Sequence, residues 1–206
     1  MNIYFTRHGQ TEWNVIGKLQ GWNNSNLTKK GIESAKRLSQ RLKDVDFDLI
    51  FSSTQERAIE TAKLIRGAKD TEIKTLDDLR EIGFGAWEAM KISKIEELYS
   101  LEYDTYINRP HLYEPLDGGE SLLDVYKRVE KVLDKVLSTE ADNILIVSHG
   151  VTLKVLTSII KEIPLEDLYT IPVQEGTALN ICEYDGNKLR FILEGDTGHI
   201  INSLEY

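Results

Sequence analysis

Several features that mark particular classes of protein are scarce or absent in this sequence. Cys182 is the only cysteine among 206 residues, so the chain can form neither an internal disulfide nor a CxxC metal or redox site. No apolar run approaches the ~20 residues that a membrane-spanning helix needs. The first residues carry neither a basic leader nor a long apolar segment, which predicts no signal peptide. We therefore expect a cytoplasmic protein that does not bind a membrane.

Positive charge is scarce as well. Lys and Arg number 25 against 34 Asp and Glu, which gives a formal net charge of −9. The overall field of such a chain does not favour nucleic acid or an anionic membrane surface. We predict no nucleic-acid partner, and any phosphate must be held by a local basic pocket. No pattern in the sequence indicates an oligomeric state.

The sequence also lacks the short motifs of several common enzyme classes. It contains no GxxxxGK[ST] P-loop, no GxSxG nucleophile elbow and no GxGxxG dinucleotide fingerprint. Its four histidines, His8, His111, His149 and His199, form no HExxH or similar metal-ligand pairing. Nucleotide hydrolysis by a P-loop, serine esterase chemistry and metal-dependent hydrolysis all lose support. We predict neither a metal nor an organic cofactor.

What the sequence does contain is an alternation of short apolar runs and amphipathic helical patterns. Buried strands are predicted at residues 2–6, 47–52, 73–76 and 143–148. Helices are predicted after Thr28, over residues 56–66, after Ser121 and from about Val151, and a hairpin turn at residues 184–188. This alternation predicts an α/β fold of three layers, α/β/α, with a mostly parallel central sheet in a single domain over residues 1–206.

One segment does not follow this rhythm. Residues 90–116 are rich in Tyr and Glu and hold two of the four prolines. We expect a small helical insertion at roughly these residues, placed as a cap. Its three basic and five acidic side chains give it a net charge of −2. Its tyrosines, Tyr99, Tyr103, Tyr106 and Tyr113, favour a pocket for neutral or apolar groups, although some of them must pack the cap itself.

Four polar clusters follow predicted strands. They are Arg7-His8-Gly9, residues 52–57, the region of Glu81, and Ser148-His149-Gly150. In an open α/β sheet the ligand crevice lies beyond the carboxyl ends of the strands. The four clusters are therefore expected at one edge of the sheet.

The residue types in these clusters suit phosphate chemistry. Arg7 offers a planar fork for phosphate oxygens, and Gly9 lets the backbone approach a ligand closely. Arg57 falls in the first turn of a helix, where backbone N–H groups favour anions. His149 precedes a helix and can donate to an anion there. A glutamate that acts as an acid near neutral pH needs dry surroundings, which Phe84 and Trp87 are expected to give Glu81.

The order of these motifs resembles the histidine phosphatase superfamily, which includes the cofactor-dependent phosphoglycerate mutases. The resemblance rests on residues 7–14, Leu19-Gln20-Gly21-Trp22, residues 52–62, Glu81 with residues 85–88, residues 118–121 and Ser148-His149-Gly150. It implies that His8 attacks phosphorus and that Glu81 is the general acid and then the base. It also implies a phosphate site formed by Arg7, Asn14, Gln20, Gly21, Arg57, His149 and Gly150.

Three functions remain open at this point. In a phosphatase, water would attack phospho-His8; in a mutase, the bound product would take the phosphoryl group back at another hydroxyl. A non-catalytic module would bind a phosphorylated ligand without turnover, but no catalytic position is missing. Mutases typically have an Arg-His-Tyr-Gly-like stretch after the acid, whereas Glu81 is followed by Ile82-Gly83-Phe84-Gly85. This departure and the acidic cap favour a phosphatase that acts on small phosphorylated metabolites.

Overall fold

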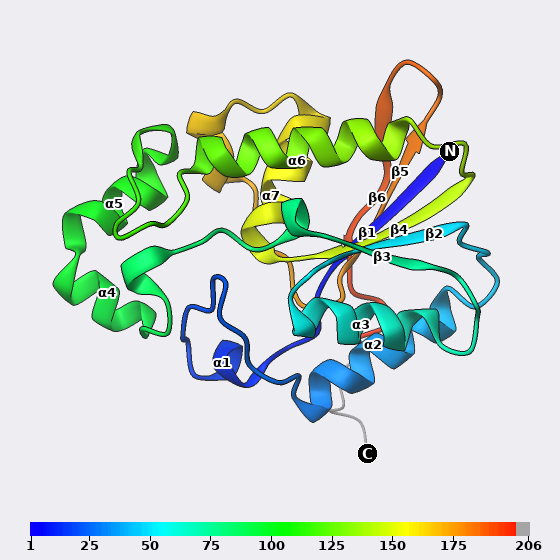
Figure 1. The fold of residues 1–206 in the computed structure, drawn as a ribbon, viewed down its shortest axis with the longest axis horizontal. Coiled ribbons are helices and arrows are strands. Elements are labelled where there is room, and N and C mark those ends of the chain that lie inside the picture. The colour runs from blue at the N-terminus through cyan, green and yellow to red at the C-terminus, as the bar shows by residue number, and fades with distance from the viewer. Residues whose placement is uncertain (201–206) are drawn as a thin grey trace.

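The computed structural model describes residues 1–200 as a six-stranded sheet between two layers of helices (Figure 1). The strands are β1 (Asn2–Arg7), β2 (Leu49–Ser53), β3 (Ile73–Leu76), β4 (Asn143–Ser148), β5 (Leu179–Tyr184) and β6 (Leu189–Asp196). Their order in the sheet is β3-β2-β4-β1-β5-β6. The first four neighbours run parallel, while β5 is antiparallel to both β1 and β6. The predicted α/β/α fold with a mostly parallel sheet is confirmed.

Helices cover both faces of this sheet. The α-helices are α1 (Glu12–Val15), α2 (Lys29–Arg41), α3 (Glu56–Arg66), α4 (Ile92–Leu98), α5 (Ser100–Asn108), α6 (Leu122–Leu137) and α7 (Gly150–Lys161). Short 3₁₀ helices are η1 (Asp77–Leu79), η2 (Gly85–Trp87), η3 (Pro110–Leu112) and η4 (Leu165–Thr170). In Figure 1, α6 and α7 lie on one side of the sheet and α2 and α3 on the other. Within residues 1–200, no helix is both long and apolar enough to span a bilayer.

Alternation along the strands divides the buried side chains between two cores. In β4, Ile144 and Ile146 belong to the cluster under α6 and α7. Leu145 and Val147 belong to the cluster under α2 and α3. Successive side chains of a strand point to opposite faces, so an uninterrupted apolar run serves both layers. β4 is therefore buried on both sides, as its sequence predicts.

Local signals set the ends of most elements. Thr28 accepts a hydrogen bond from the backbone of Gly31 at the start of α2, and Ser121 forms a capping box with Asp124 at the start of α6. The hairpin at residues 184–188 is confirmed. The prediction of a strand over residues 47–52 was wrong at its start, because β2 begins at Leu49. Phe47 is buried by edge-to-face packing on Tyr4, with ring centroids 5.1 Å apart, before strand pairing begins.

The expected helical insertion consists of α4, α5 and η3. It lies beyond the carboxyl ends of the central strands, at the left of Figure 1. Trp87 is fully buried and forms the centre of its packing. The Trp87 ring lies 5.4 Å from that of Tyr113 and 5.8 Å from that of Tyr106. The aromatic side chains of this segment therefore build a small core of their own.

Candidate active site

The four predicted polar clusters meet at the carboxyl edge of the sheet. His8 follows β1, and its backbone N–H donates to the carbonyl of Ser148 at the end of β4. The rings of His8 and His149 lie 5.2 Å apart. Arg57, in the first turn of α3, reaches His8 from the β2 side. The expectation that these side chains share one edge is confirmed.

His8 is held in a single tautomer by its hydrogen bonds. Its Nδ1 lies 2.7 Å from the carbonyl oxygen of Gly9, and because a carbonyl can only accept, Nδ1 carries the proton. Nε2 then accepts from Nε of Arg57 at 3.3 Å. Burial, and then the charges of Arg7 and Arg57, hold the pKa of His8 well below its ordinary value. The ring is therefore neutral, with a lone pair on Nε2.

Arg57 donates to this lone pair, and Arg7 adds a second positive charge that acts on His8. Arg57 is 1% exposed, and its terminal nitrogens donate to the carbonyls of Asn23 at 2.7 Å and Gly21 at 3.0 Å. Burial lowers the pKa of Arg57 to about 10, so the side chain is charged at neutral pH. Arg7 donates to the carbonyl of Gln174 at 3.0 Å. Its Nε is buried and has no hydrogen-bond partner among residues 1–200.

His149 is the N-cap of α7 and is fully buried. Neither of its ring nitrogens has a hydrogen-bond partner within the described part of the chain. Burial is the main cause that holds the pKa of His149 well below its ordinary value. A buried polar atom without a partner is costly, which makes such an atom a natural donor or acceptor for a ligand. His149 lines a small cavity together with Arg7 and Gly150.

Glu81 lies on the other side of the site and is fixed by backbone amides. Its carboxylate accepts from the backbone N–H groups of Ile82 at 3.0 Å, Val151 at 3.2 Å and Thr152 at 3.3 Å. Two of these donors, the N–H groups of Val151 and Thr152, belong to the first turn of α7. Phe84 lines the same cavity as Glu81, but Trp87 does not. The expectation that Trp87 shelters Glu81 was therefore wrong, because that ring is committed to the core of the insertion.

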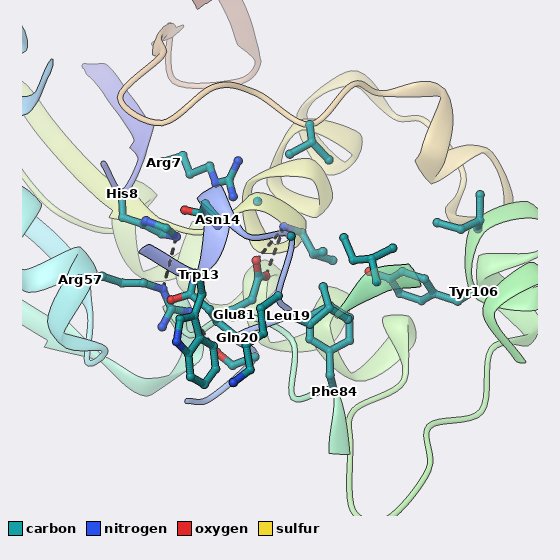
Figure 2. Close-up of a pocket in the computed structure, with 18 of the residues that line it drawn as sticks. Arg7, His8, Trp13, Asn14, Leu19, Gln20, Arg57, Glu81, Phe84 and Tyr106 are labelled. Atoms are coloured by element: carbon teal, nitrogen blue, oxygen red, sulfur yellow. Dashed lines mark hydrogen bonds between the residues drawn. The ribbon is translucent and has the colours of Figure 1, made fainter. Parts of the chain in front are cut away.

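The cavity between these groups, which we call the main cavity of the site, has a volume of about 260 Å³. Figure 2 shows the charged side chains gathered around Glu81 at one end, with Phe84 and Tyr106 toward the other. Residues predicted for the site that line it are Arg7, His8, Asn14, Gln20, Gly21, Arg57, Glu81 and Gly150. Of the four tyrosines of the insertion, Tyr103 and Tyr106 line the cavity, while Tyr99 and Tyr113 only pack the small core.

Two of these residues have side chains occupied by internal contacts. The amide of Gln20 donates to Oγ of Thr11 at 3.0 Å and accepts from Ser25 at 3.0 Å. The amide oxygen of Asn14 accepts from the backbone of Thr11 at 3.0 Å. Gln20 therefore shapes the loop around the cavity, and Asn14 retains its amide nitrogen as the group that can donate to a ligand.

Gly9 packs closely against α2. A Cβ at this position would lie 2.6 Å from the carbonyl oxygen of Gly31 in α2. Close packing of the loop on α2 therefore requires glycine here. The interpretation that Gly9 lets the backbone approach a ligand closely stays a prediction.

Sequence reasoning missed several residues that complete the site. Gln55 is buried, accepts from the backbone of Glu81 at 2.8 Å and donates to the carbonyl of Gly21 at 2.6 Å. Trp13, Lys18, Tyr169 and Val173 line the cavity. Gln55 lies within residues 52–57, one of the four polar clusters, so its position in the sequence could have identified it as a site residue. His111, by contrast, is exposed and does not line the main cavity.

Comparison with known proteins agrees with this geometry. A family model described as the histidine phosphatase superfamily (branch 1) matches residues 3–197. The chain belongs to the histidine phosphatase superfamily. The match covers the phosphate-binding residues, the insertion and the late hairpin alike.

Three similar proteins illustrate the range of the family. The chain is 33% identical to phosphoserine phosphatase 1 of Hydrogenobacter thermophilus, over 76% of this chain and 74% of that protein. It is 32% identical to the probable phosphoglycerate mutase GpmB of Proteus mirabilis, over 80% and 76%. The solved structure of Bacillus stearothermophilus YhfR superimposes with a TM-score of 0.92 at 39% identity, covering 97% of this chain and 99% of that one.

Proposed function

We propose that this chain is a phosphomonoesterase that works through a phosphohistidine on His8. In the first step, Nε2 of His8 attacks phosphorus, a P–N bond forms and the P–O bond to the leaving group breaks. Glu81 gives its proton to the leaving oxygen, which departs as an alcohol. In the second step, the Glu81 carboxylate takes a proton from water, the water oxygen bonds to phosphorus, and the P–N bond breaks to release inorganic phosphate.

The observation that carries this proposal is the state of His8. A neutral imidazole with its proton on Nδ1, a lone pair on Nε2 and the charges of Arg7 and Arg57 nearby is the form that a nucleophile needs. We propose that Arg7 and Arg57, which line the main cavity, and His149, which lines the adjoining small cavity, hold the phosphoryl oxygens. Phosphoryl transfer depends mainly on positioning and charge neutralisation, and these groups supply both. We propose Asn14, the Gln20-Gly21 backbone and Gly150 as the remaining phosphate contacts.

Glu81 is suited to both proton transfers by its place in the cavity. It faces the space between the arginines and Phe84 (Figure 2). Its backbone is fixed by Gln55 and its carboxylate by the first turn of α7. The same group can therefore meet the leaving oxygen and then the attacking water without a rearrangement of the chain.

The other end of the cavity favours an apolar or aromatic leaving group. Phe84, Tyr103, Tyr106, Tyr169 and Ile107 line it. Beyond Arg7 and Arg57, the only Lys or Arg side chain of the described residues on this lining is Lys18, which lies 4.0 Å from the Trp13 ring centroid. Phosphoserine and phosphoglycerate carry a carboxylate that would have to pair with this one lysine. We propose small monoesters of uncharged alcohols as the preferred substrates.

A cofactor-dependent phosphoglycerate mutase is the alternative, and one of the similar proteins bears that name. A panel of phosphate monoesters separates the two functions. We expect hydrolysis of aryl esters to exceed that of phosphoserine, and we expect an acid-labile phosphoenzyme that His8→Ala cannot form. Interconversion of 3- and 2-phosphoglycerate faster than hydrolysis of every ester would establish the mutase. Binding of phosphate esters without turnover would establish a non-catalytic module.

A further inference from the structure

Lys154 is an unusual residue in the interior of this protein. It lies one turn into α7 and is 4% exposed. Lysine is almost never buried without a carboxylate partner, because removing an ammonium group from water is costly. None of the ion pairs found in residues 1–200 includes Lys154. Burial lowers the pKa of Lys154 to about 8, so most of it remains charged at pH 7.

The hydrogen bond and the cation–π contact of Lys154 both lie on one neighbouring segment. Its Nζ donates to the carbonyl of Ile171. The same atom lies 4.4 Å from the centroid of the Tyr169 ring, which is a cation–π contact. Both partners belong to residues 169–174, which we call the wall segment. Lys154 therefore links α7 to the wall segment through a hydrogen bond and a cation–π contact.

The wall segment forms one side of the main cavity. Tyr169 and Val173 line it, and the Tyr169 ring meets the Tyr106 ring edge to face at 5.1 Å. Two aromatic rings from distant parts of the chain thus form one surface at the leaving-group end. The Tyr169 side chain is thus held between the Tyr106 ring and the ammonium group of Lys154. Lys154 is the charged group that contacts this ring from the side of α7.

The other end of the wall segment is anchored independently. Gln174 exchanges two side-chain hydrogen bonds with Asn180 in β5, at 2.8 Å and 2.6 Å. Its carbonyl holds Arg7, and the backbone of Thr177 donates to the carbonyl of Arg7 at 2.9 Å. The phosphate side of the wall therefore has anchors of its own, and Lys154 also borders the small cavity that Arg7 and His149 line.

From this division we infer that Lys154 is a positioning residue that sets how tightly the active site binds bulky leaving groups, by holding Tyr169 against the cavity. The inference rests on the proposed phosphatase function, because it concerns the same cavity. Loss of Lys154 should weaken binding of an aryl leaving group and spare the phosphate end. A general structural role would instead lower the activity toward all substrates alike.

The test compares 1-naphthyl phosphate with ethyl phosphate at pH 7. In Lys154→Met, which keeps the length of the side chain, we expect KM for the naphthyl ester to rise about tenfold, the equivalent of ~1.4 kcal/mol. We expect kcat for that ester, and kcat/KM for ethyl phosphate, to stay within about twofold. Lys154→Arg keeps a charged donor and should restore most of the lost affinity. Lys161→Met is the matched control, because Lys161 lies on the same helix but pairs with exposed Glu194.

An unchanged KM for the naphthyl ester in Lys154→Met would overturn the inference. So would an equal loss for both esters, or a failure of Lys154→Arg to restore binding. Calorimetric titration with benzylphosphonate and with inorganic phosphate tests the wall without turnover. We expect weaker binding of benzylphosphonate alone in Lys154→Met, and equal affinities in the two proteins would refute the role of Lys154. If the wild type hydrolyses no ester, the proposed function fails, and the titration still decides the inference.

Discussion

Glu81→Gln removes the ionisable proton and keeps the size of the side chain. The Glu81 carboxylate accepts hydrogen bonds from three backbone N–H groups. A glutamine side chain has only one oxygen that can accept hydrogen bonds. If that oxygen takes the place of Oε1, it still faces Ile82, Val151 and Thr152. The amide nitrogen then replaces Oε2, which lies 3.3 Å from the N–H of Val151. The loss amounts to one weakened hydrogen bond, about 1 kcal/mol of folding stability.

The effect on the reaction should be much larger than the effect on folding. A positioned general acid or base contributes about 10²- to 10⁴-fold, or ~2.7 to 5.5 kcal/mol of the activation barrier. Alkyl esters have poor leaving groups and need the proton from Glu81 in the first step. Nitrophenyl phosphate has a good leaving group and depends little on the proton from Glu81. Water attack on phospho-His8 needs the base for every substrate.

The assay is a rapid-mixing measurement with both kinds of ester. With nitrophenyl phosphate, Glu81→Gln should release a burst of nitrophenol close to the enzyme concentration and then turn over slowly, with phosphohistidine accumulating. With an alkyl ester it should show no burst and a kcat/KM lowered at least a hundredfold. Glu88→Gln is the matched control. Glu88 also accepts backbone N–H groups, from Trp22 at 2.8 Å and Phe84 at 3.2 Å, but does not line the cavity.

Two results would refute the assignment of Glu81. One is a kcat/KM of Glu81→Gln for the alkyl ester within about threefold of the wild-type value, because the loss of a general acid should lower this rate constant far more than that. The other is an equal loss in Glu88→Gln, which would mean that the loop geometry and not the proton on Glu81 carries the effect.

Three further predictions follow from the same contacts. Burial and neighbouring arginines depress the pKa of His8 and of His149, so below about pH 6.5 the unfolded chain binds protons that the folded chain does not. The melting temperature should therefore fall as the pH drops below 6.5, and a slope that stays the same in His8→Ala would contradict this. Dialysis against a chelator should leave phosphatase activity intact, whereas a loss that an added divalent metal restores would contradict the metal-independent mechanism. Gly9→Ala places a methyl group 2.6 Å from the Gly31 carbonyl oxygen and should cost about 1 to 3 kcal/mol of stability, which denaturant unfolding would measure; an unchanged midpoint would show that α2 can move away.

The sequence allowed the fold and the charged end of the site to be predicted, for a physical reason. Parallel strands bring their carboxyl ends to one edge, so a polar residue that directly follows a buried strand is already placed in space. His8 and His149 were located in this way, and Arg57 by its position in the first turn of a helix. Glu81 was placed at this edge by the same rule, although η1 separates it from β3, and its role as acid and base came from the resemblance to a family.

The apolar end of the site could not be predicted in the same way. Tyr169 and Lys154 belong to no motif, and their contact depends on how η4 returns across α7. Trp87 lies beside catalytic residues in the sequence, and only the packing of the insertion shows that its ring turns away from them. Gln55 acts through residues 34 and 26 positions away, Gly21 and Glu81, which no local pattern encodes. Side chains that work through tertiary contacts leave weak signals in a single sequence.

The position of β4 between β1 and β2 has a consequence for how the protein is made. Asn2 of β1 pairs with Asn143 of β4. During synthesis, β1 therefore has no β4 to pair with until the ribosome has added about 140 more residues. Until then the central edges of β1 and β2 have no neighbour, and such edges are prone to aggregate. Pairing over so long a stretch of chain also slows folding. A nascent chain that already contains His8, Arg57 and Glu81 therefore cannot assemble them, and activity begins only when β4 has entered the sheet and α7 has followed it.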